Sequence, residues 1–253
     1  MMGKEAKSNI EGLWQEPFAS VICYPKPCKK ELSERLKELR RLGIEAIEFT
    51  GEKDAFNLKV LGKGCVGIVV IAYRGREKVA LKIRRVDADR SRMQHEAEML
   101  KKANSVGVGP KFLGASKNFL LMQFVEGDLL PKWLEAPRKT IEVKRVLREV
   151  LEQCWRLDEA GLDHGELSHA PKHIIVDKYG KPFIVDFETA SLNRKPSNVT
   201  SICQFLFISG IVVEKIAKKI GEIDKKEIIK ALREYKAKKS RENFEMVLKA
   251  CSL

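Results

Sequence analysis

Residues 56–85, FNLKVLGKGCVGIVVIAYRGREKVALKIRR, decide the fold. Runs of β-branched and apolar residues alternate with glycine-containing turns, which predicts successive strands and a hairpin tip at residues 74–77. Gly62, Gly64 and Gly67 have a GxGxxG spacing that dinucleotide-binding turns also use, but in those turns a helix begins at the glycines. Here they lead into the apolar run IVVIAY, which predicts another strand. A glycine loop between two strands lets backbone amides approach the phosphates of a nucleotide, because no side chain keeps them apart.

A lysine and a glutamate follow this loop. Lys82 lies in the apolar strand VALKI, fifteen residues after Gly67, and Val69 lies two residues after the same glycine. A buried ammonium group needs a partner of opposite charge. Glu96, in the segment RMQHEAEMLKK, is the natural partner. The plain alternative for both residues is an exposed surface charge, but the glycine loop upstream favours a phosphate-binding lysine held by a glutamate.

The flanking segments complete an α+β protein. After the loop, the pattern predicts a helix over 91–103, strands near 112–114 and 119–125, and helices over 140–160 and most of 200–253. Before the loop, it predicts a strand from Ala19, a helix over 29–42 ended by Gly43, and a strand over 44–51. Because strands come first and helices later, we expect a two-lobed fold with a β-rich N-lobe and a helical C-lobe.

We divide the chain into three parts on this pattern. Residues 1–57 form a short N-terminal β-α-β extension without catalytic residues, residues 58–125 the N-lobe, and residues 126–253 the C-lobe. The extension has the character of a packing or docking appendage.

The third informative stretch is GLDHGELSHAPKHIIVD, residues 161–177, followed by KPFIVDFETAS, residues 181–191. With the glycine loop and Lys82, these segments resemble the protein-kinase superfamily, in particular its atypical members of the RIO and Bud32 type. The resemblance covers residues 58 to about 210. The HGELS segment is similar to the catalytic loop of those families, and Asp186-Phe187-Glu188 is similar to their DFG motif.

The resemblance implies a role for each matching residue. Asp186 would bind the Mg²⁺ that bridges the phosphates of ATP, Lys82 would hold the α- and β-phosphates, and Glu96 would orient Lys82. Glu166 would accept or steer the proton of the acceptor hydroxyl. The segment 122–127 would form the adenine-binding hinge, with further contacts to the cofactor from Gln123, Val125 and Asp128, the last near the ribose.

The chain departs from the family pattern at three positions. Glu166 replaces the usual aspartate, so its carboxylate reaches one methylene further. Pro171 occupies the slot of a metal-binding asparagine, and an insertion of two residues would put His173 there. Since imidazole is a poor ligand for Mg²⁺, Lys172 or His173 would contact phosphate instead. Glu188 replaces the DFG glycine, where it is either inert or an additional metal ligand.

The segment after DFE is short. Only TASLNRKPSNV, residues 189–199, separates it from the next apolar helix, and no APE-like motif follows. Conventional protein kinases use a longer segment as the platform for a substrate peptide. This chain must therefore present its acceptor in another way.

The acceptor suggested by the resemblance is RNA. HGELS and KHIIV on a short basic chain are similar to an archaeal family that phosphorylates the 2′-hydroxyl of an internal uridine in tRNA. The formal net charge is +13, while residues 1–57 hold 10 basic and 10 acidic residues, so the whole excess lies on the kinase region. Such an excess favours a polyanionic partner. The basic residues gather in two groups, Arg74, Arg76, Lys78, Arg84 and Arg85 beside Lys82, and Lys215, Lys218, Lys219, Lys225, Lys226 and Lys230 near the C-terminus.

Two other functions stay open from the sequence. One is an atypical Ser/Thr protein kinase of the RIO or Bud32 type, and the other is an ATP-hydrolysing switch on an RNA–protein particle. No apolar run approaches the roughly 20 residues of a membrane helix, and the start MMGKEAKSNIEG is too polar for a secretory signal. The six scattered cysteines contain no CxxC pair. We therefore expect a cytoplasmic protein with no membrane partner.

Overall fold

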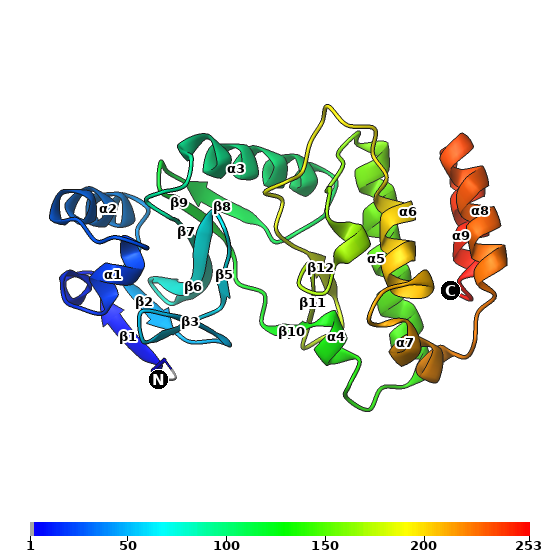
Figure 1. Cartoon of the computed structure of the whole chain (residues 1–253), viewed down its shortest axis with the longest axis horizontal. Helices are drawn as coiled ribbons and strands as arrows, with labels where there is room; N and C mark the ends of the chain where they lie inside the picture. The colour runs from blue at the N-terminus through cyan, green and yellow to red at the C-terminus, as the bar shows by residue number, and fades with distance from the viewer. Residues whose placement is uncertain (1–2) are drawn as a thin grey trace. The chain divides into compact units, whose positions relative to one another are not determined.

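The computed structural model describes residues 3–253, which form two compact units (Figure 1). Unit 1 comprises the chain up to Leu100 together with Lys111–Phe124, and unit 2 comprises Lys101–Pro110 together with Val125–Leu253. Unit 1 is rich in strands and unit 2 is mainly helical, so the predicted α+β fold with two lobes is confirmed. The predicted extension starts at residue 1, and residues 1 and 2 lie outside the described residues.

The main sheet of unit 1 is antiparallel and has the strand order β1-β2-β6-β7-β9-β8, with β5 paired to β6. Its strands are β1 (Ala6–Asn9), β2 (Ala46–Phe49), β5 (Gly62–Lys63), β6 (Gly67–Arg74), β7 (Glu77–Arg84), β8 (Phe112–Ala115) and β9 (Phe119–Gln123). A separate hairpin pairs β3 (Lys53–Ala55) with β4 (Leu58–Val60). Arg74 and Glu77 face each other across the β6–β7 turn, so the predicted hairpin tip is confirmed.

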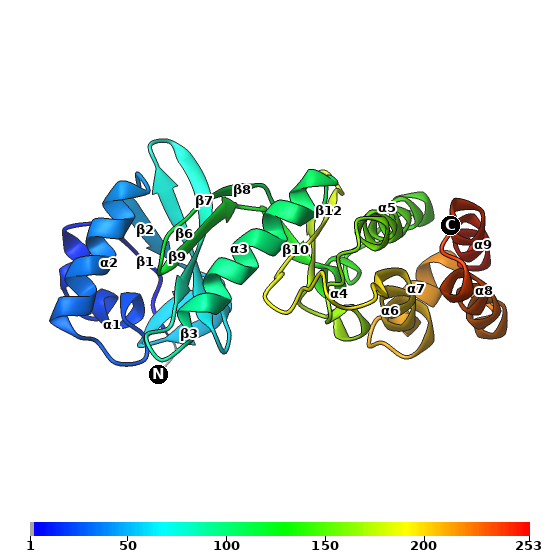
Figure 2. The same ribbon diagram turned by 90° about the horizontal axis from the view of Figure 1, so that it is seen from above.

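Helices lie on both faces of this sheet (Figure 2). The helices α1 (Phe18–Ile22) and α2 (Lys29–Arg41) pack their apolar residues on one face, where Leu36 and Leu39 join a core with Val70 and Leu81. Side chains alternate between the faces of a strand. Lys82 therefore points to the opposite face, where α3 (Arg90–Ser105) lies.

The strand predicted from Ala19 is wrong. Residues 18–22 form helix α1, whose last four residues are buried, and the first strand is the polar segment AKSN, β1. β1 becomes a strand because its backbone pairs with β2, a tertiary effect that overrides the weak strand preference of these residues. β2 in turn pairs with β6. The first 57 residues therefore extend the same sheet that carries the glycine loop.

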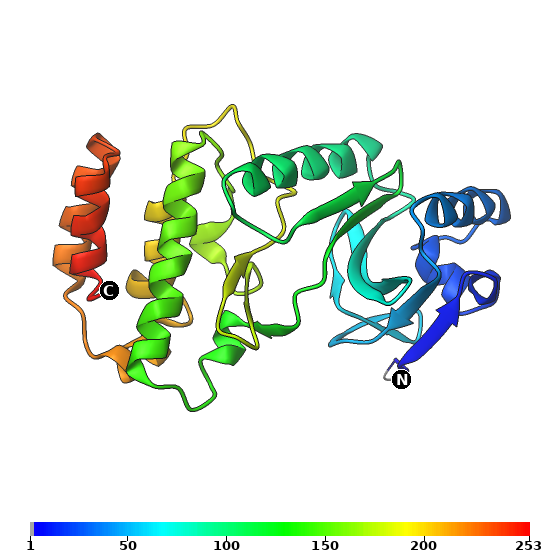
Figure 3. The ribbon, with the colours of Figure 1, turned by 180° about the vertical axis from the view of Figure 1, so that it is seen from behind.

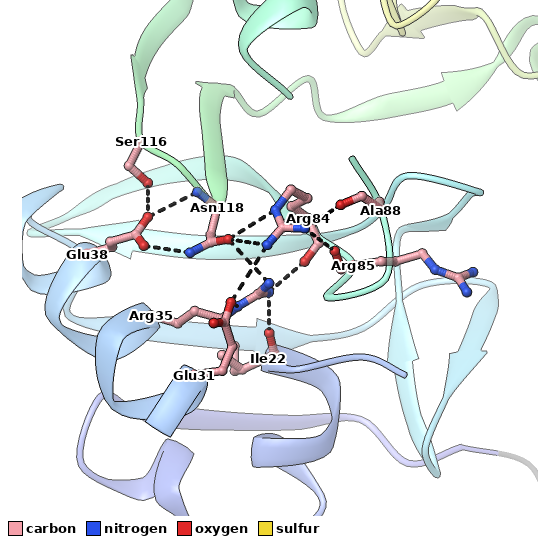
Figure 4. A network of polar contacts seen from close by, with 9 residues as sticks. All are labelled: Ile22, Glu31, Arg35, Glu38, Arg84, Arg85, Ala88, Ser116 and Asn118. Atoms are coloured by element: carbon pink, nitrogen blue, oxygen red, sulfur yellow. Dashed lines mark hydrogen bonds and ion pairs between the residues drawn. The ribbon is translucent and has the colours of Figure 1, made fainter. Parts of the chain in front are cut away.

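Two buried arginines join α2 to this sheet (Figure 4). Arg35 donates hydrogen bonds to Ile22 O at 2.8 Å and Arg84 O at 2.5 Å, and its Nε lies 2.9 Å from Glu31. Arg84 donates to Asn118 Oδ1 at 2.7 and 3.0 Å. Asn118 is held in turn by Glu38, which accepts its side-chain amide at 2.6 Å. The network compensates two charges that would be costly to bury alone.

Unit 2 is organised around the long helix α5 (Thr140–Glu159), which runs between a small sheet and the C-terminal helices (Figure 3). The sheet consists of β10 (Gly127–Leu129), β11 (Ile174–Asp177) and β12 (Pro182–Ile184). The other helices are α4 (Leu130–Trp133), α6 (Asn198–Cys203) with a π-helical turn at Gln204–Ile208, α7 (Val213–Ile220), α8 (Lys225–Ala237) and α9 (Arg241–Ala250).

A buried polar group fixes three of these helices to one another. Asp158 of α5 accepts hydrogen bonds from the side chain of Asn198 in α6 at 2.8 Å and from the hydroxyl of Tyr235 in α8 at 2.8 Å. Burial and the neighbouring Asp158 carboxylate raise the pKa of Tyr235, which keeps its hydroxyl protonated as a donor. Within residues 3–253, no single helix has the length and apolar character to cross a membrane; α6 with its π-helical turn and α7 pass that test only as a pair bent by 75°.

Candidate functional site

The glycine loop of unit 1 lies between β5 and β6 and closes with a hydrogen bond from Gly64 N–H to Gly67 O at 2.8 Å. A Cβ on Gly67 would lie 2.8 Å from the carbonyl oxygen of Ile83, so glycine is needed there for packing. A Cβ on Gly62 or Gly64 would make only ordinary contacts. The internal packing of the chain therefore does not require glycine at these two positions, which leaves approach of a ligand as a physical reason for it.

Lys82 and Glu96 form a buried ion pair in unit 1. Lys82 Nζ lies 2.7 Å from Glu96 Oε2, and both side chains are almost fully buried. Val69 faces Lys82 across the β6–β7 pair, on the same side of the sheet. The pairing expected from the sequence is present, while the role of the pair in holding ATP stays a prediction.

The predicted hinge residues are placed at the end of unit 1 and the start of unit 2. Gln123 ends β9 and is exposed, and its side chain accepts a hydrogen bond from Lys111 N–H at 3.2 Å. Val125 is buried, and Asp128, in β10, pairs with Lys132 at 2.9 Å. Their contacts with adenine and ribose remain predictions.

In unit 2, the catalytic-loop residues meet around one histidine. His173 Nε2 lies 3.1 Å from Glu166 Oε2 and 3.8 Å from Asp186 Oδ2. Lys172 Nζ lies 3.9 Å from the same Asp186 oxygen. His173 is only 1% exposed, whereas the Glu166 side chain is 38% exposed. The loop therefore offers one partly exposed carboxylate, a neighbouring acid and a cation, all held over a buried imidazole.

Burial keeps the two histidines of this loop neutral. Burial lowers the pKa of His173, although the carboxylates of Asp186 and Glu166 oppose the shift. Burial and the nearby His173 lower the pKa of His164 to about 4. His164 Nε2 lies 3.1 Å from Val185 O and acts there as a donor in the matching tautomer. The neutral rings thus serve as packing groups beneath the acids, and His164 also hydrogen-bonds the backbone.

Asp186 has an unusual backbone. Its φ is +70°, a left-handed conformation that costs a residue with a side chain of the order of 1 kcal/mol and is concentrated at functional positions. Carboxylate oxygens of Asp186 and Glu188 lie within 4.8 Å of each other, and both residues are half-buried. Oxygen donors at this spacing suit Mg²⁺, whereas the imidazole of His173 does not. The residues present therefore fit a metal held by the two acids.

A second set of residues supports this loop and was not identified in the sequence. Gly165 has φ +89°, and a Cβ there would lie 2.5 Å from Arg194 Nη2. Arg194 Nε pairs with Asp163 at 2.9 Å, and Thr189 Oγ1 donates to His164 O at 3.0 Å. The short segment after DFE is thereby tied back onto the catalytic loop. The usable signal was Asp163 directly before HGELS, followed by an arginine in the short segment.

The basic cluster predicted beside Lys82 is wrong for Arg84, which is buried in the α2 network and cannot contact RNA. Three of its neighbours are already paired: Arg74 with Glu77 at 2.8 Å, Lys78 with Glu48 at 3.7 Å, and Arg85 with Asp87 at 2.8 Å. Arg76 is exposed. A pattern of charges in a strand does not reveal which of them the fold neutralises.

The C-terminal lysines also differ in whether their ammonium groups are already engaged within the protein. Lys215 pairs with Glu135 at 2.6 Å, and the ammonium groups of Lys219 and Lys225 donate to backbone carbonyls at 2.9 and 2.8 Å. Three others are exposed: Lys218, Lys226 and Lys230.

The part of the chain that matches known proteins contains most of these site residues. A family model for the RIO domain matches residues 70–201, more than half of the chain. The KEOPS complex subunit Bud32 of Pyrococcus abyssi is 28% identical over 130 residues, which are 49% of this chain and 57% of Bud32. The uncharacterised protein MJ1211 of Methanocaldococcus jannaschii is 27% identical over 118 residues, which are 46% of this chain and 97% of that protein. The aligned part thus spans just over half the length of Bud32 and nearly all of the second relative.

Proposed function

The chain belongs to the RIO domain family of the atypical protein-kinase-like superfamily, and on this premise we propose that it is an ATP-dependent phosphotransferase acting on RNA. It transfers the γ-phosphate of ATP to the 2′-hydroxyl of an internal uridine in tRNA. The relatives and the family match support the coarser part of this proposal, the use of ATP by a kinase-like domain. The RNA acceptor rests on the form of the catalytic loop and on charge.

The observation that carries the proposal is the arrangement around His173. Glu166 is partly exposed, and its Oε2 lies 3.1 Å from Nε2 of the buried neutral His173, so its carboxylate borders the buried ring and stays open to an acceptor. In this position it orients the attacking hydroxyl and receives its proton. Lys172 stands beside Asp186 with its side chain 65% exposed, where it supplies positive charge to the transferred phosphate.

The nucleotide-binding residues are divided between the two units. In unit 1, Lys82 holds the α- and β-phosphates, and Glu96 fixes its position. In unit 2, Asp186 and Glu188 hold Mg²⁺, which when bound neutralises charge on the phosphates. We also propose that residues 1–57 take no part in this chemistry, so that the division of the chain at residues 57 and 125 is a functional one.

Two features support an RNA acceptor: the segment after DFE is short, and the chain has a large net positive charge. Nine residues, 189–197, lie between DFE and the start of α6 at Asn198, and Asp163 ties them down through Arg194, so they form no extended platform for a peptide. Folded RNA is recognised through phosphates and 2′-hydroxyls. A chain with a formal charge of +13 suits that partner.

The test is transfer of label from γ-labelled ATP to purified tRNA, with a panel of candidate proteins in parallel. Alkaline cleavage of RNA requires a free 2′-hydroxyl as the internal nucleophile. Phosphorylation of an internal 2′-hydroxyl therefore yields a labelled dinucleotide that resists alkali, whereas a terminal phosphate does not. Omission of RNA should abolish label at this position. Label only on RNA termini would contradict the 2′-hydroxyl acceptor.

Family membership favours one second candidate, a Ser/Thr protein kinase of the RIO or Bud32 type. Label confined to protein serine or threonine, without inhibition by excess tRNA, would replace our proposal by this one. Release of phosphate without transfer to either acceptor would instead indicate an ATP-hydrolysing switch.

A further inference from the structure

A hollow in unit 2 contains two arginines without an acidic partner. It has a volume of about 620 Å³ and is lined by β10, the start of α5 and the turn after β11. The guanidinium of Arg138 lies 4.8 Å from the ring centre of Trp133, and Arg145 Nη2 donates to Tyr179 O at 3.5 Å. Among residues 3–253, neither arginine has a carboxylate oxygen within 4.0 Å. The hollow is within the size range of small-ligand sites.

The acids around this hollow are already engaged. Each of the four lining carboxylates has a partner: Glu126 with Lys178 at 2.9 Å, Asp128 with Lys132 at 2.9 Å, Glu142 with Lys139 N–H at 3.0 Å, and Asp177 with the N–H groups of Tyr179 and Lys181 at 2.9 and 2.8 Å. None of them neutralises the two guanidinium groups. A ligand with phosphate oxygens would therefore find donors that the protein itself leaves unused.

An aromatic ring stands at the rim. Tyr179 lies in the turn between β11 and β12 and is 78% exposed. Gly180 beside it has φ +76°, and a Cβ there would lie 2.8 Å from Arg145 Nη2. Glycine thus lets the guanidinium lie against the turn that carries the ring. An exposed tyrosine next to unpaired arginines is the combination that binds single-stranded nucleic acid, with bases stacked and phosphates paired.

We propose that this hollow is a second contact site for an unpaired segment of the RNA substrate. Arg138 and Arg145 bind its phosphate, and Tyr179 stacks on an adjacent base. This inference rests on the proposed RNA acceptor. Strand β11 links the two places, since His173 precedes it and Lys178 follows it. At about 3.3 Å per residue, the hollow lies roughly 15 Å from the catalytic loop, a distance that one folded RNA spans easily.

The experiment measures the affinity of purified bulk tRNA by fluorescence anisotropy across a salt titration. The test variant is Arg138→Gln with Arg145→Gln, and the matched control is Arg41→Gln with Arg148→Gln. The control also removes two exposed arginine charges, one of them from α5 itself. We expect the test variant to bind tRNA at least about tenfold more weakly, with a salt slope shallower by roughly 1.4–1.8. The control should change affinity less than about threefold, in line with the loss of unspecific charge alone.

Tyr179 gives an independent arm. Tyr179→Ala should weaken tRNA binding about fivefold or more through loss of stacking, while Tyr179→Phe should bind like the wild type. All variants should retain the wild-type affinity for ATP, which reports on folding. Equal losses in the two arginine variants, or no effect of Tyr179→Ala, would overturn the site and leave the RNA acceptor standing. Absence of tRNA binding by a wild-type protein that binds ATP would overturn both.

Discussion

Unit 1 holds Arg35 and Arg84 at 0% and 2% exposure, whereas unit 2 leaves Arg138 and Arg145 exposed around a hollow. The buried pair shares Asn118 and Glu31 and fastens a helix to a sheet. The exposed pair has no acidic partner among the described residues. The two buried arginines of unit 1 thus hold the fold together, whereas the two arginines of the hollow are open to a ligand. Net charge summed along the sequence does not distinguish these two uses of a basic residue.

The largest effect is expected when one catalytic charge is removed from each unit. We expect Lys82→Ala and Asp186→Ala each to lower phosphoryl transfer on the order of 10⁴-fold, because both positioning and charge stabilisation are lost. Transfer of label from ATP measures the effect, and circular dichroism shows whether the variants remain folded. Activity within about tenfold of the wild type in either variant would remove the kinase assignment.

The next test concerns stability in unit 1. Arg35→Met should lower the free energy of unfolding by about 3–5 kcal/mol, because two buried carbonyl groups lose their donor and Glu31 loses one of its two arginines. Arg40→Met is the matched control on the same helix. Its exposed pair with Glu11 should contribute little to stability, because solvent screens the two charges. Chemical denaturation measures both, and similar values for the two variants would contradict the structural role of Arg35.

In unit 2, the buried histidine makes stability depend on pH. The pKa of His164 is about 4 in the folded protein and rises to about 6.5 in the unfolded chain. The unfolded chain therefore binds the proton first as pH falls, and stability that is complete above pH 6.5 declines towards pH 4. Protonation of His164 in the unfolded chain should lower the free energy of unfolding by about 2 kcal/mol between pH 7 and pH 5.

The comparison for this prediction is His164→Gln against His169→Gln, an exposed position in the same loop. Denaturation followed by tryptophan fluorescence should show a flatter pH dependence of stability only for the first variant. An unchanged profile in His164→Gln would assign the acid sensitivity to other groups.

The smallest effect is expected for the paired arginines of the N-lobe. Arg74→Gln with Arg85→Gln should change tRNA affinity less than about threefold, because both guanidinium groups are engaged by carboxylates. The tRNA titration described for the hollow measures it directly. A loss as large as that of the Arg138 and Arg145 variant would show that the units do not differ in this way.

The parts of the fold that periodicity could predict are those with one strong apolar pattern. The β6–β7 hairpin and α5 were predicted close to their observed bounds because each fills a core face. β1 could not be predicted, since AKSN has no apolar alternation and is a strand only through its pairing with β2. The short helix α1 has β-branched residues that a strand would also use.

The residues of the site also fall into those that a local sequence pattern predicts and those that depend on tertiary packing. Its motifs name Lys82, Glu166 and Asp186 from local sequence alone. The burial of Arg84 depends on Arg35, 49 residues before it, and on Asn118, 34 residues after it. Such partners follow from tertiary packing, and no local pattern contains them. Asp163 and Arg194 are intermediate, since their positions beside HGELS and in the short segment give a signal, while their ion pair follows only from the fold.

The pairing of β2 with β6 limits how far the chain can be shortened. A fragment trimmed to the family match, residues 70–201, would lose β1, β2 and α2 together. The stretch Ile71–Tyr73 would then present unpaired backbone groups along an open sheet edge, which other chains can join. Arg84 would at the same time lose the hydrogen bond that Arg35 donates to its carbonyl oxygen and its ion pair with Glu31. Such a fragment should self-associate, so work on a minimal enzyme must keep the first strands.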